Sequence, residues 1–128
     1  MNIPITPGSI APPAAGYELA MHVHARSELL YTSGILGNRP DGSIADDIGE
    51  QAAEMWRSVA VILAAAGFRA DDIVSYTTYA VAGHDLSRVM AARDAFLGSH
   101  RAASTLVPVP ALARQEWKVE VAVVAARS

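Results

Sequence analysis

The chain has 128 residues, of which 52% are hydrophobic and 18% charged, and its formal net charge is −3 at pH 7. This length predicts a single domain spanning residues 1–128. The chain contains no cysteine, which excludes disulfides, thiolate catalysis and cysteine-ligated zinc. Its basic residues form no run, so neither nucleic-acid binding nor ribonuclease activity has an electrostatic basis.

The N-terminal segment, residues 1–16, holds four of the seven prolines and is predicted to be an extended lead-in rather than a second domain. It lacks the basic start and apolar core of a secretory signal. The longest apolar run, 59–68, is too short to cross a bilayer. We therefore expect a cytoplasmic protein that has no membrane partner.

Two strands are predicted next, over residues 17–24 and 29–37. The turn at 25–28 would join them as a hairpin, and Gly34 interrupts the second strand. Residues 38–44 form a further turn, in which Pro40, Asp41 and Gly42 supply the backbone conformations that a turn needs.

The first helix is expected to begin at Asp47, because Asp47 and Glu50 have the spacing of a capping box. Gly67 is expected to end it. Between these points, apolar residues recur at steps of three and four, as on one helical face: Ile48, Ala52, Met55, Val59, Ile62 and Ala66.

The second half of the chain alternates strand and helix patterns. Residues 73–82 are rich in β-branched and aromatic side chains, which is typical of a strand. A second helix over 86–97 would be capped by Asp85. Strands over 104–109 and 118–125 close the chain, and Pro108 places the former near a sheet edge.

The predicted order, β-β-α-β-α-β-β, indicates an α+β fold with both helices on one face of a sheet. The other face is then bare. A sheet with a bare apolar face must bury it, and further copies of the same chain are the simplest cover. The low charge content also favours a homo-oligomer.

Three histidines and a Ser-Gly pair are weaker candidates for chemistry. His22 and His24 share a strand face and could hold a metal, but no third ligand is near, which favours surface or interface histidines. His100 could titrate near neutral pH. Ser33 has no His and Asp partners in a known order, and Gly34 beside it favours close approach of a ligand or strand.

A set of short motifs runs in order over residues 16–126. Together they resemble the RidA/YjgF family of imine and enamine deaminases. The resemblance implies a chorismate-mutase-like fold, a homotrimeric barrel with three clefts between subunits, and hydrolysis of reactive imines without a cofactor. The motifs are Gly16-Tyr17, Tyr31-Thr32-Ser33-Gly34, Pro40-Asp41-Gly42, Gln51, Ala65-Ala66-Gly67, Asp72-Ile73-Val74, Phe96, Ala103-Ser104-Thr105-Leu106-Val107 and Val119-Glu120-Val121.

Four polar positions of the family cleft are small or apolar in this chain. By the resemblance, an arginine that grips the substrate carboxylate is replaced by Ala103, and a glutamate that handles water by Ala122. A glutamine is replaced by Ile35 and an asparagine by Met90. We therefore expect an interfacial small-molecule site for a ligand less anionic than a 2-imino acid. Its expected lining is Tyr17, Ser33, Gly34, Ile35, Met90, Ala103, Ser104, Thr105 and Ala122.

Three residues are candidates for the chemistry itself. Arg101, two residues before Ala103 on the same strand face, could swing into the cleft or remain an exposed loop arginine. Glu120 could act as a displaced base or pair structurally with an arginine. Tyr17 matches the family's cleft tyrosine, and could instead be a half-buried strand residue. The sequence thus predicts a C–N hydrolase, with a non-catalytic metabolite-binding or regulatory trimer as the alternative.

Overall fold

A computed structural model describes all 128 residues. Its main sheet has the strand order β3-β7-β5-β6, with the two-residue strand β4 also paired to β7. Strands β5 and β6 are parallel, and all pairs with β7 are antiparallel, so the sheet is mixed. The strand bounds are β3 Glu28–Tyr31, β4 Ile35–Leu36, β5 Ile73–Val81, β6 Ala103–Val109 and β7 Val119–Arg127.

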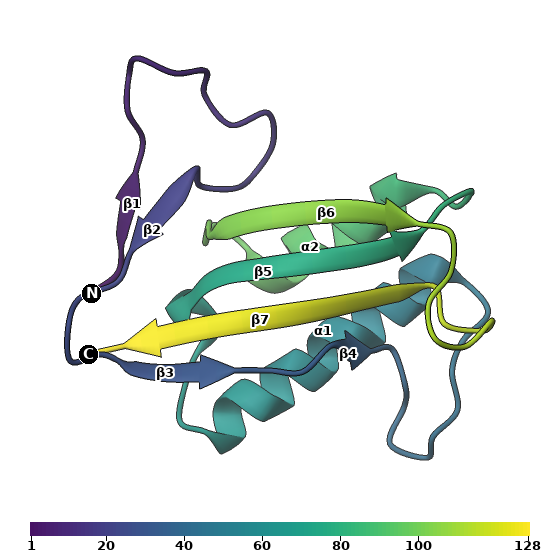
Figure 1. The fold of residues 1–128 in the computed structure, drawn as a ribbon. Helices are drawn as coiled ribbons and strands as arrows, with labels where there is room; N and C mark the ends of the chain where they lie inside the picture. The colour runs from purple at the N-terminus through teal and green to yellow at the C-terminus, as the bar shows by residue number, and fades with distance from the viewer.

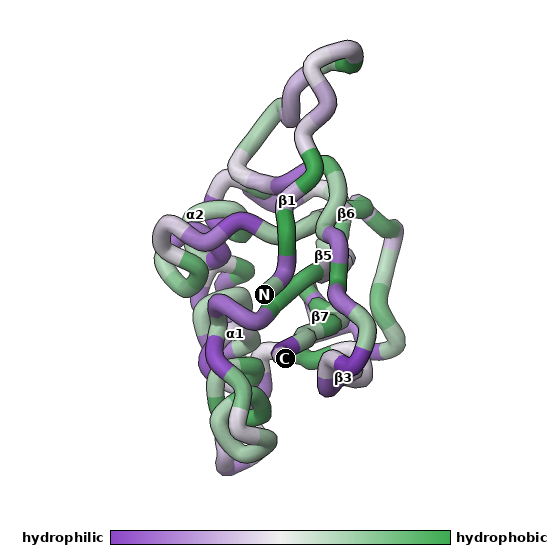
Figure 2. The backbone as a smooth tube through the Cα atoms, turned by 90° about the vertical axis from the view of Figure 1, so that its left-hand side faces the viewer, coloured by the Kyte–Doolittle hydropathy of each residue, from purple (hydrophilic) through white to green (hydrophobic).

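Two helices, α1 (Ile48–Ala65) and α2 (Leu86–Leu97), lie on the same face of this sheet (Figure 1). The edge-on view of Figure 2 shows them on one side of the strands and no helix on the other. A short 3-10 helix, η1 (Ala70–Asp72), precedes β5. The prediction of an α+β fold with one bare sheet face is confirmed. Neither helix combines the length and the apolar character that crossing a bilayer requires.

The core lies between the helices and the sheet. Along β7 every second residue from Val119 to Val123 is fully buried, while the residues between them are half-buried. On α1 the fully buried side chains include Met55 and Trp56, and the Trp56 ring stacks on Phe96 of α2. Alternate residues of the strand thus pack against one face of the helix, as the sequence pattern predicts.

The predicted helix starts are confirmed by their caps. The Asp47 carboxylate accepts a hydrogen bond from the Glu50 backbone N–H at 2.9 Å. Asp85 accepts one from the Ser87 N–H at 3.0 Å and another from the Ser87 hydroxyl at 2.6 Å. The hydrogen bonds from Ser87 lower the pKa of Asp85 below its ordinary value, because they favour the charged form.

The predicted hairpin between 17–24 and 29–37 is wrong. Strand β2 (Ala20–His22) pairs instead with β1 (Ile3–Ile5), which lies inside the expected lead-in. The proline in β1 is tolerated because this two-stranded sheet has only edge strands. Residues 1–24 therefore form an N-terminal arm that extends beyond the end of the main sheet (Figures 1 and 2).

The predicted break at Gly34 is present, and it separates β3 from β4. Between the pairs Tyr31–Val124 and Ile35–Val121 the first strand advances four residues and β7 only three. One extra residue is therefore accommodated as a bulge around Ser33 and Gly34. The bulge reverses the side to which the following residues point, so Ile35 faces the core and Leu36 the opposite side of the sheet.

Candidate functional site

The sheet face opposite the helices is called the open face. On β5, Ser75, Thr77 and Tyr79 alternate with residues buried against the helices, so they point to the open face. Their partners across the ladders point the same way. The open face consists of Leu29, Tyr31, Leu36, Ser75, Thr77, Tyr79, Val81, Ala103, Thr105, Val107, Val109, Glu120, Ala122, Val124 and Ala126.

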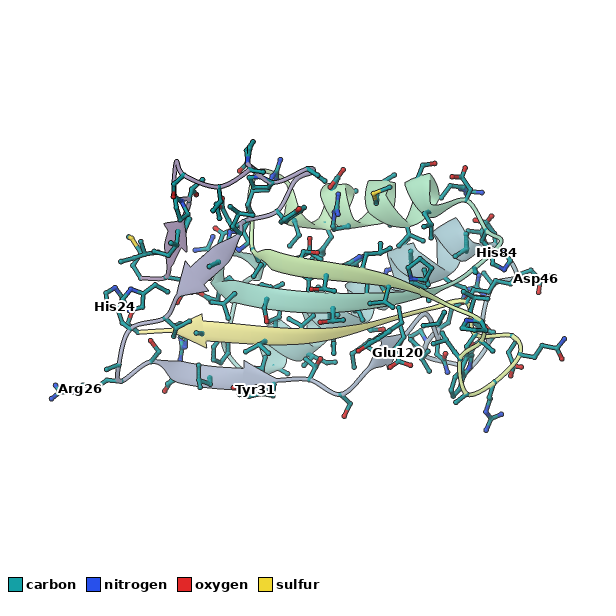
Figure 3. All side chains as sticks on the ribbon, turned by 45° about the horizontal axis from the view of Figure 1, so that its top comes forward. His24, Arg26, Tyr31, Asp46, His84 and Glu120 are labelled. Atoms are coloured by element: carbon teal, nitrogen blue, oxygen red, sulfur yellow. The ribbon has the colours of Figure 1, made fainter.

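The Glu120 carboxylate lies close to Gly34. A Cβ added to Gly34 would lie 2.0 Å from Glu120 Oε2, so only glycine leaves room for this carboxylate. Glu120 is half-buried, and no lysine or arginine of the chain forms a salt bridge with it. Figure 3 shows Glu120 on β7 and Tyr31 on β3. The interpretation of Glu120 as a structural carboxylate paired with an arginine is therefore not what the structure contains.

Arg101 is held at the start of β6. Its Nη1 donates to the backbone carbonyls of Gly98 at 3.0 Å and His100 at 3.2 Å. Its Nε lies 3.2 Å from where a Gly16 Cβ would be, so the guanidinium packs against the arm. Arg101 is an exposed residue of the loop before β6, one of the two positions expected for it.

Tyr17 lies next to Arg101 in the arm. Its hydroxyl accepts a hydrogen bond from the Ala14 backbone N–H at 3.2 Å, and the ring is half-buried. The neighbouring Glu18 N–H donates to the Ala102 carbonyl at 2.8 Å, which fixes this part of the arm to the start of β6. Tyr17 and Arg101 therefore form one group at the end of the sheet that the arm adjoins.

Glu120 is far from that group within one chain. The arm residue Glu18, next to Tyr17, bridges to Ala103 at the start of β6. Glu120 lies in the row of Tyr79 on β5, and that row meets β6 at Val107. Four residues of strand separate the two points, about 13 Å, and two strand spacings add about 10 Å across the sheet. One small molecule does not contact both Tyr17 and Glu120 of the same chain.

The other predicted site residues do not all lie on the open face. Ala103, Thr105 and Ala122 lie on the open face with Glu120, and Ser33 and Gly34 are exposed in the adjoining bulge. Three lie elsewhere. Ile35 packs against the core, Ser104 pairs with the buried Tyr76 on the helix side, and Met90 lies on α2.

Sequence reasoning assigned no role to three open-face residues. Tyr79 is opposite Glu120, Thr77 is opposite Ala122, and Tyr31 is 70% exposed on β3. The sequence carries no alternating signal for the two β5 residues, because all five residues from Ser75 to Tyr79 have a hydroxyl group and the buried Tyr76 and Thr78 are as polar as their neighbours.

A groove of about 660 Å³ opens between the arm, η1 and the loop before β6. Arg101, His100 and Glu18 line it, together with Asp71 and Asp72, but Glu120 does not. The groove carries charges of both signs and is open to solvent. It is separate from the open face, where the carboxylate lies.

The candidate histidines are not part of a metal-binding cluster. The rings of His22 and His24 stack with centroids 5.6 Å apart on the exposed arm. No group of three or more His, Cys, Asp or Glu side chains is placed to hold a metal ion. His100 Nε2 lies 2.8 Å from the Ile73 carbonyl, where it links the loop before β6 to β5.

Comparison with known proteins gives a family match over almost the whole chain. The model of the family described as endoribonuclease L-PSP matches residues 9–127. A 2-iminobutanoate/2-iminopropanoate deaminase of Salmonella typhimurium is 30% identical over 125 residues, which cover 94% of this chain and 91% of the relative.

Solved structures agree with this match. The YjgF gene product of E. coli has a TM-score of 0.73 at 30% identity. The structure of E. coli TdcF with bound serine has a TM-score of 0.73 at 28% identity. Each of these two comparisons covers 92% of this chain and 94% of the other chain. The Rid-family protein YyfB of Yersinia pestis has the higher TM-score of 0.86, at 23% identity and with 98% of both chains covered. At that identity the last comparison shows the shared fold alone.

Proposed function

Since the chain belongs to the RidA/YjgF family, whose model carries the L-PSP description, we propose that it is a cofactor-free hydrolase converting an imine or enamine to a carbonyl compound and ammonia. The Salmonella typhimurium relative named as an iminobutanoate deaminase supports this reaction class. The observation that carries the proposal is the Glu120 carboxylate, half-buried, unpaired with any cation of the chain and held against Gly34.

The proposed working form is a homotrimer in which the open faces close a central barrel. Support comes from the exposed apolar surface of this face, on which Leu29 is 53% and Tyr31 70% exposed. Val107 and Val124 add to it. Association would bury this surface, and the substrate would then bind in clefts between copies.

Each cleft is proposed to combine groups from two copies. Tyr17 and Glu120 of one chain are too far apart to hold one small substrate, so Glu120 of one copy would face Tyr17 of the next. Arg101 would act as a positioning residue, because it fixes the arm beside Tyr17 through Gly16 and the Gly98 and His100 carbonyls.

In the proposed mechanism a water molecule lies between Glu120 and the Tyr17 hydroxyl. Glu120 takes one proton while the water oxygen bonds to the carbon of the protonated imine, and the C=N π electrons move to nitrogen. Glu120 then returns this proton to the nitrogen of the carbinolamine, the C–N bond breaks to release ammonia, and the hydroxyl gives its proton to Glu120 as the C=O bond forms. Ala103 and Ala122 leave apolar space for the carbon skeleton.

The direct test is the variant Glu120→Gln, which keeps the shape of the side chain but removes its basicity. An oxidase generates the imine in the assay, and semicarbazide traps whatever is not hydrolysed. We expect the hydrolysis rate to fall by about 10²–10⁴-fold. Glu50→Gln, an exposed carboxylate on α1, serves as the control and should retain the wild-type rate. Equal rates for wild type and Glu120→Gln would refute the role of Glu120.

A second candidate is a non-catalytic metabolite-binding or regulatory trimer. The structure of E. coli TdcF with bound serine shows a relative that holds a small amino compound. For this alternative, a stable analogue would bind in the cleft while imine hydrolysis stayed at the uncatalysed rate. Binding and turnover measured on the same preparation therefore separate the two candidates.

A further inference from the structure

The open face carries one charged side chain, that of Glu120. All other side chains of the face are apolar or carry a hydroxyl. The base nearest to Glu120 in the sequence is Lys118, directly before β7, and its ammonium donates to the Asp46 carbonyl rather than to Glu120. Arg101 is likewise bound to backbone carbonyls. Within one chain the charge of the face is therefore negative, because neither the Arg101 guanidinium nor the Lys118 ammonium is bonded to Glu120. In the proposed assembly, Arg101 of the next copy would lie on the Tyr17 side of the cleft.

This charge distribution discriminates between substrates that share a C=N bond. A 2-imino acid would bring its carboxylate into a cleft whose charge is already that of a carboxylate, and like charges in a partly buried site repel strongly. Its carboxylate would also lose water, and the guanidinium nearest the proposed cleft, that of Arg101, already donates from Nη1 to the Gly98 and His100 carbonyls. A protonated imine without a carboxylate is a cation, and it would form a charge-assisted hydrogen bond with Glu120.

We infer that the substrates are carboxylate-free iminium ions of the type RCH=NH2+, an assignment that rests on the hydrolase function proposed above. The overall reaction is RCH=NH2+ + H2O → RCHO + NH4+. Glu120 passes one water proton to nitrogen, and it then takes the second from the carbinolamine hydroxyl as the C=O bond forms and gives it to the released ammonia. Oxidation of a primary amine is the class of reaction that would supply this substrate. Oxidation of an amino acid would supply the disfavoured, carboxylate-bearing class.

The hydroxyl groups beside Glu120 fit such a ligand. Tyr79 is opposite Glu120 across the β5–β7 ladder, and Thr77 and Thr105 occupy the next row of the face. Hydroxyls can accept from an iminium N–H or hold a water molecule without adding charge. The apolar Val107 and Val124 border them and would contact the R group.

A matched pair of imines tests the inference. A flavin-dependent amine oxidase acting on 2-phenylethylamine gives 2-phenylethanimine, and an amino acid oxidase acting on phenylalanine gives the same skeleton with a carboxylate. We expect kcat/KM at pH 7 to be higher for the carboxylate-free imine by about tenfold or more. An equal or higher value for the 2-imino acid would overturn the inference while leaving the hydrolase function intact.

Binding of stable analogues distinguishes failure of the substrate inference from failure of the hydrolase proposal. Phenylacetamidinium is a planar cation of the same shape as the phenylacetate anion, and calorimetry compares them on wild type, Glu120→Gln and the control Glu50→Gln. We expect the cation to bind at least about tenfold more tightly than the anion, and this preference to be lost only in Glu120→Gln. If neither imine is hydrolysed, the hydrolase proposal fails, and calorimetry alone decides the charge preference. Tighter binding of the anion to wild type would overturn it.

Discussion

Among single residues, the contact between Glu120 and Gly34 is the one on which the candidate site depends most. A carboxylate with no cation partner is held where any other residue at position 34 would collide with it. The position of the carboxylate thus depends on a glycine in a bulge of the neighbouring strand. If Gly34 only supports the fold of the bulge, a change at Glu120 should not compensate for its substitution. If Gly34 makes room for the Glu120 carboxylate, a shorter side chain at position 120 should restore part of the activity.

Gly34→Ala is expected to lower kcat for imine hydrolysis by about 10–100-fold, because the added methyl displaces the carboxylate. Adding Glu120→Asp, whose shorter side chain avoids the methyl, should restore part of that loss. Gly8→Ala is the control, since nothing lies within 4 Å of the added Cβ. A wild-type rate for Gly34→Ala, or no recovery in the double variant, would contradict the positioning role.

Residue patterns could predict part of this site and not the rest. The break at Gly34 and the candidate Glu120 were readable from the sequence. The inward turn of Ile35 was not, because a one-residue bulge reverses the side of every residue after it. The same period-two rule places Ser104 on the helix side, although it directly adjoins two open-face residues.

At the scale of elements, Gln51 links α1 to two loops. Its buried side chain donates to the carbonyls of Ala45 at 2.7 Å and Glu116 at 2.9 Å, and accepts from the Lys118 N–H at 2.9 Å. It therefore fixes the start of β7, and with it the strand that carries Glu120. In the sequence Gln51 was one element of a family motif, with no sign of which loops it would join.

Gln51→Leu is expected to lower the free energy of unfolding by about 2–4 kcal/mol, because buried backbone groups lose their partners. Urea denaturation measures this loss. The exposed Gln115→Leu is the control and should change stability by less than about 0.5 kcal/mol. A loss below about 1 kcal/mol for Gln51→Leu would show that water satisfies these groups.

The helices and the long strands were predictable because their periodicity extends over many residues. The α1 and α2 caps, β5 and β7 all lie where local patterns place them. The pairing of β2 was not predictable, because a three-residue strand carries little register information and two partners were available along the chain. Closeness in the sequence favoured residues 29–37 as the partner of β2, but β3 in that segment pairs with β7 instead.

At the scale of the whole molecule, the bare sheet face is the feature that a single chain leaves without a partner. One-sided helix coverage follows from the order of elements, and it was predictable. The proposed trimer goes one step further, and it makes the open face both an assembly surface and the wall of a cleft.

Tyr31→Glu tests that assembly. Tyr31 is 70% exposed in the single chain, so a charge there should leave the fold of the monomer intact. Within a barrel closed by open faces the added carboxylate would be buried, which disfavours association. Sedimentation equilibrium should show a trimer for wild type and a shift toward monomer for Tyr31→Glu. Identical masses for the two would contradict burial of Tyr31 between copies.

In the proposed trimer each cleft takes Glu120 from one copy and Tyr17 from another, and subunit complementation tests this sharing. Glu120→Gln and Tyr17→Phe are each expected to have little activity, and they are mixed as unfolded chains in equal amounts and refolded together. Random assembly then places an intact Glu120 opposite an intact Tyr17 in about a quarter of the clefts. The account predicts recovery of about a quarter of the wild-type rate. A mixture no more active than its two components would contradict it.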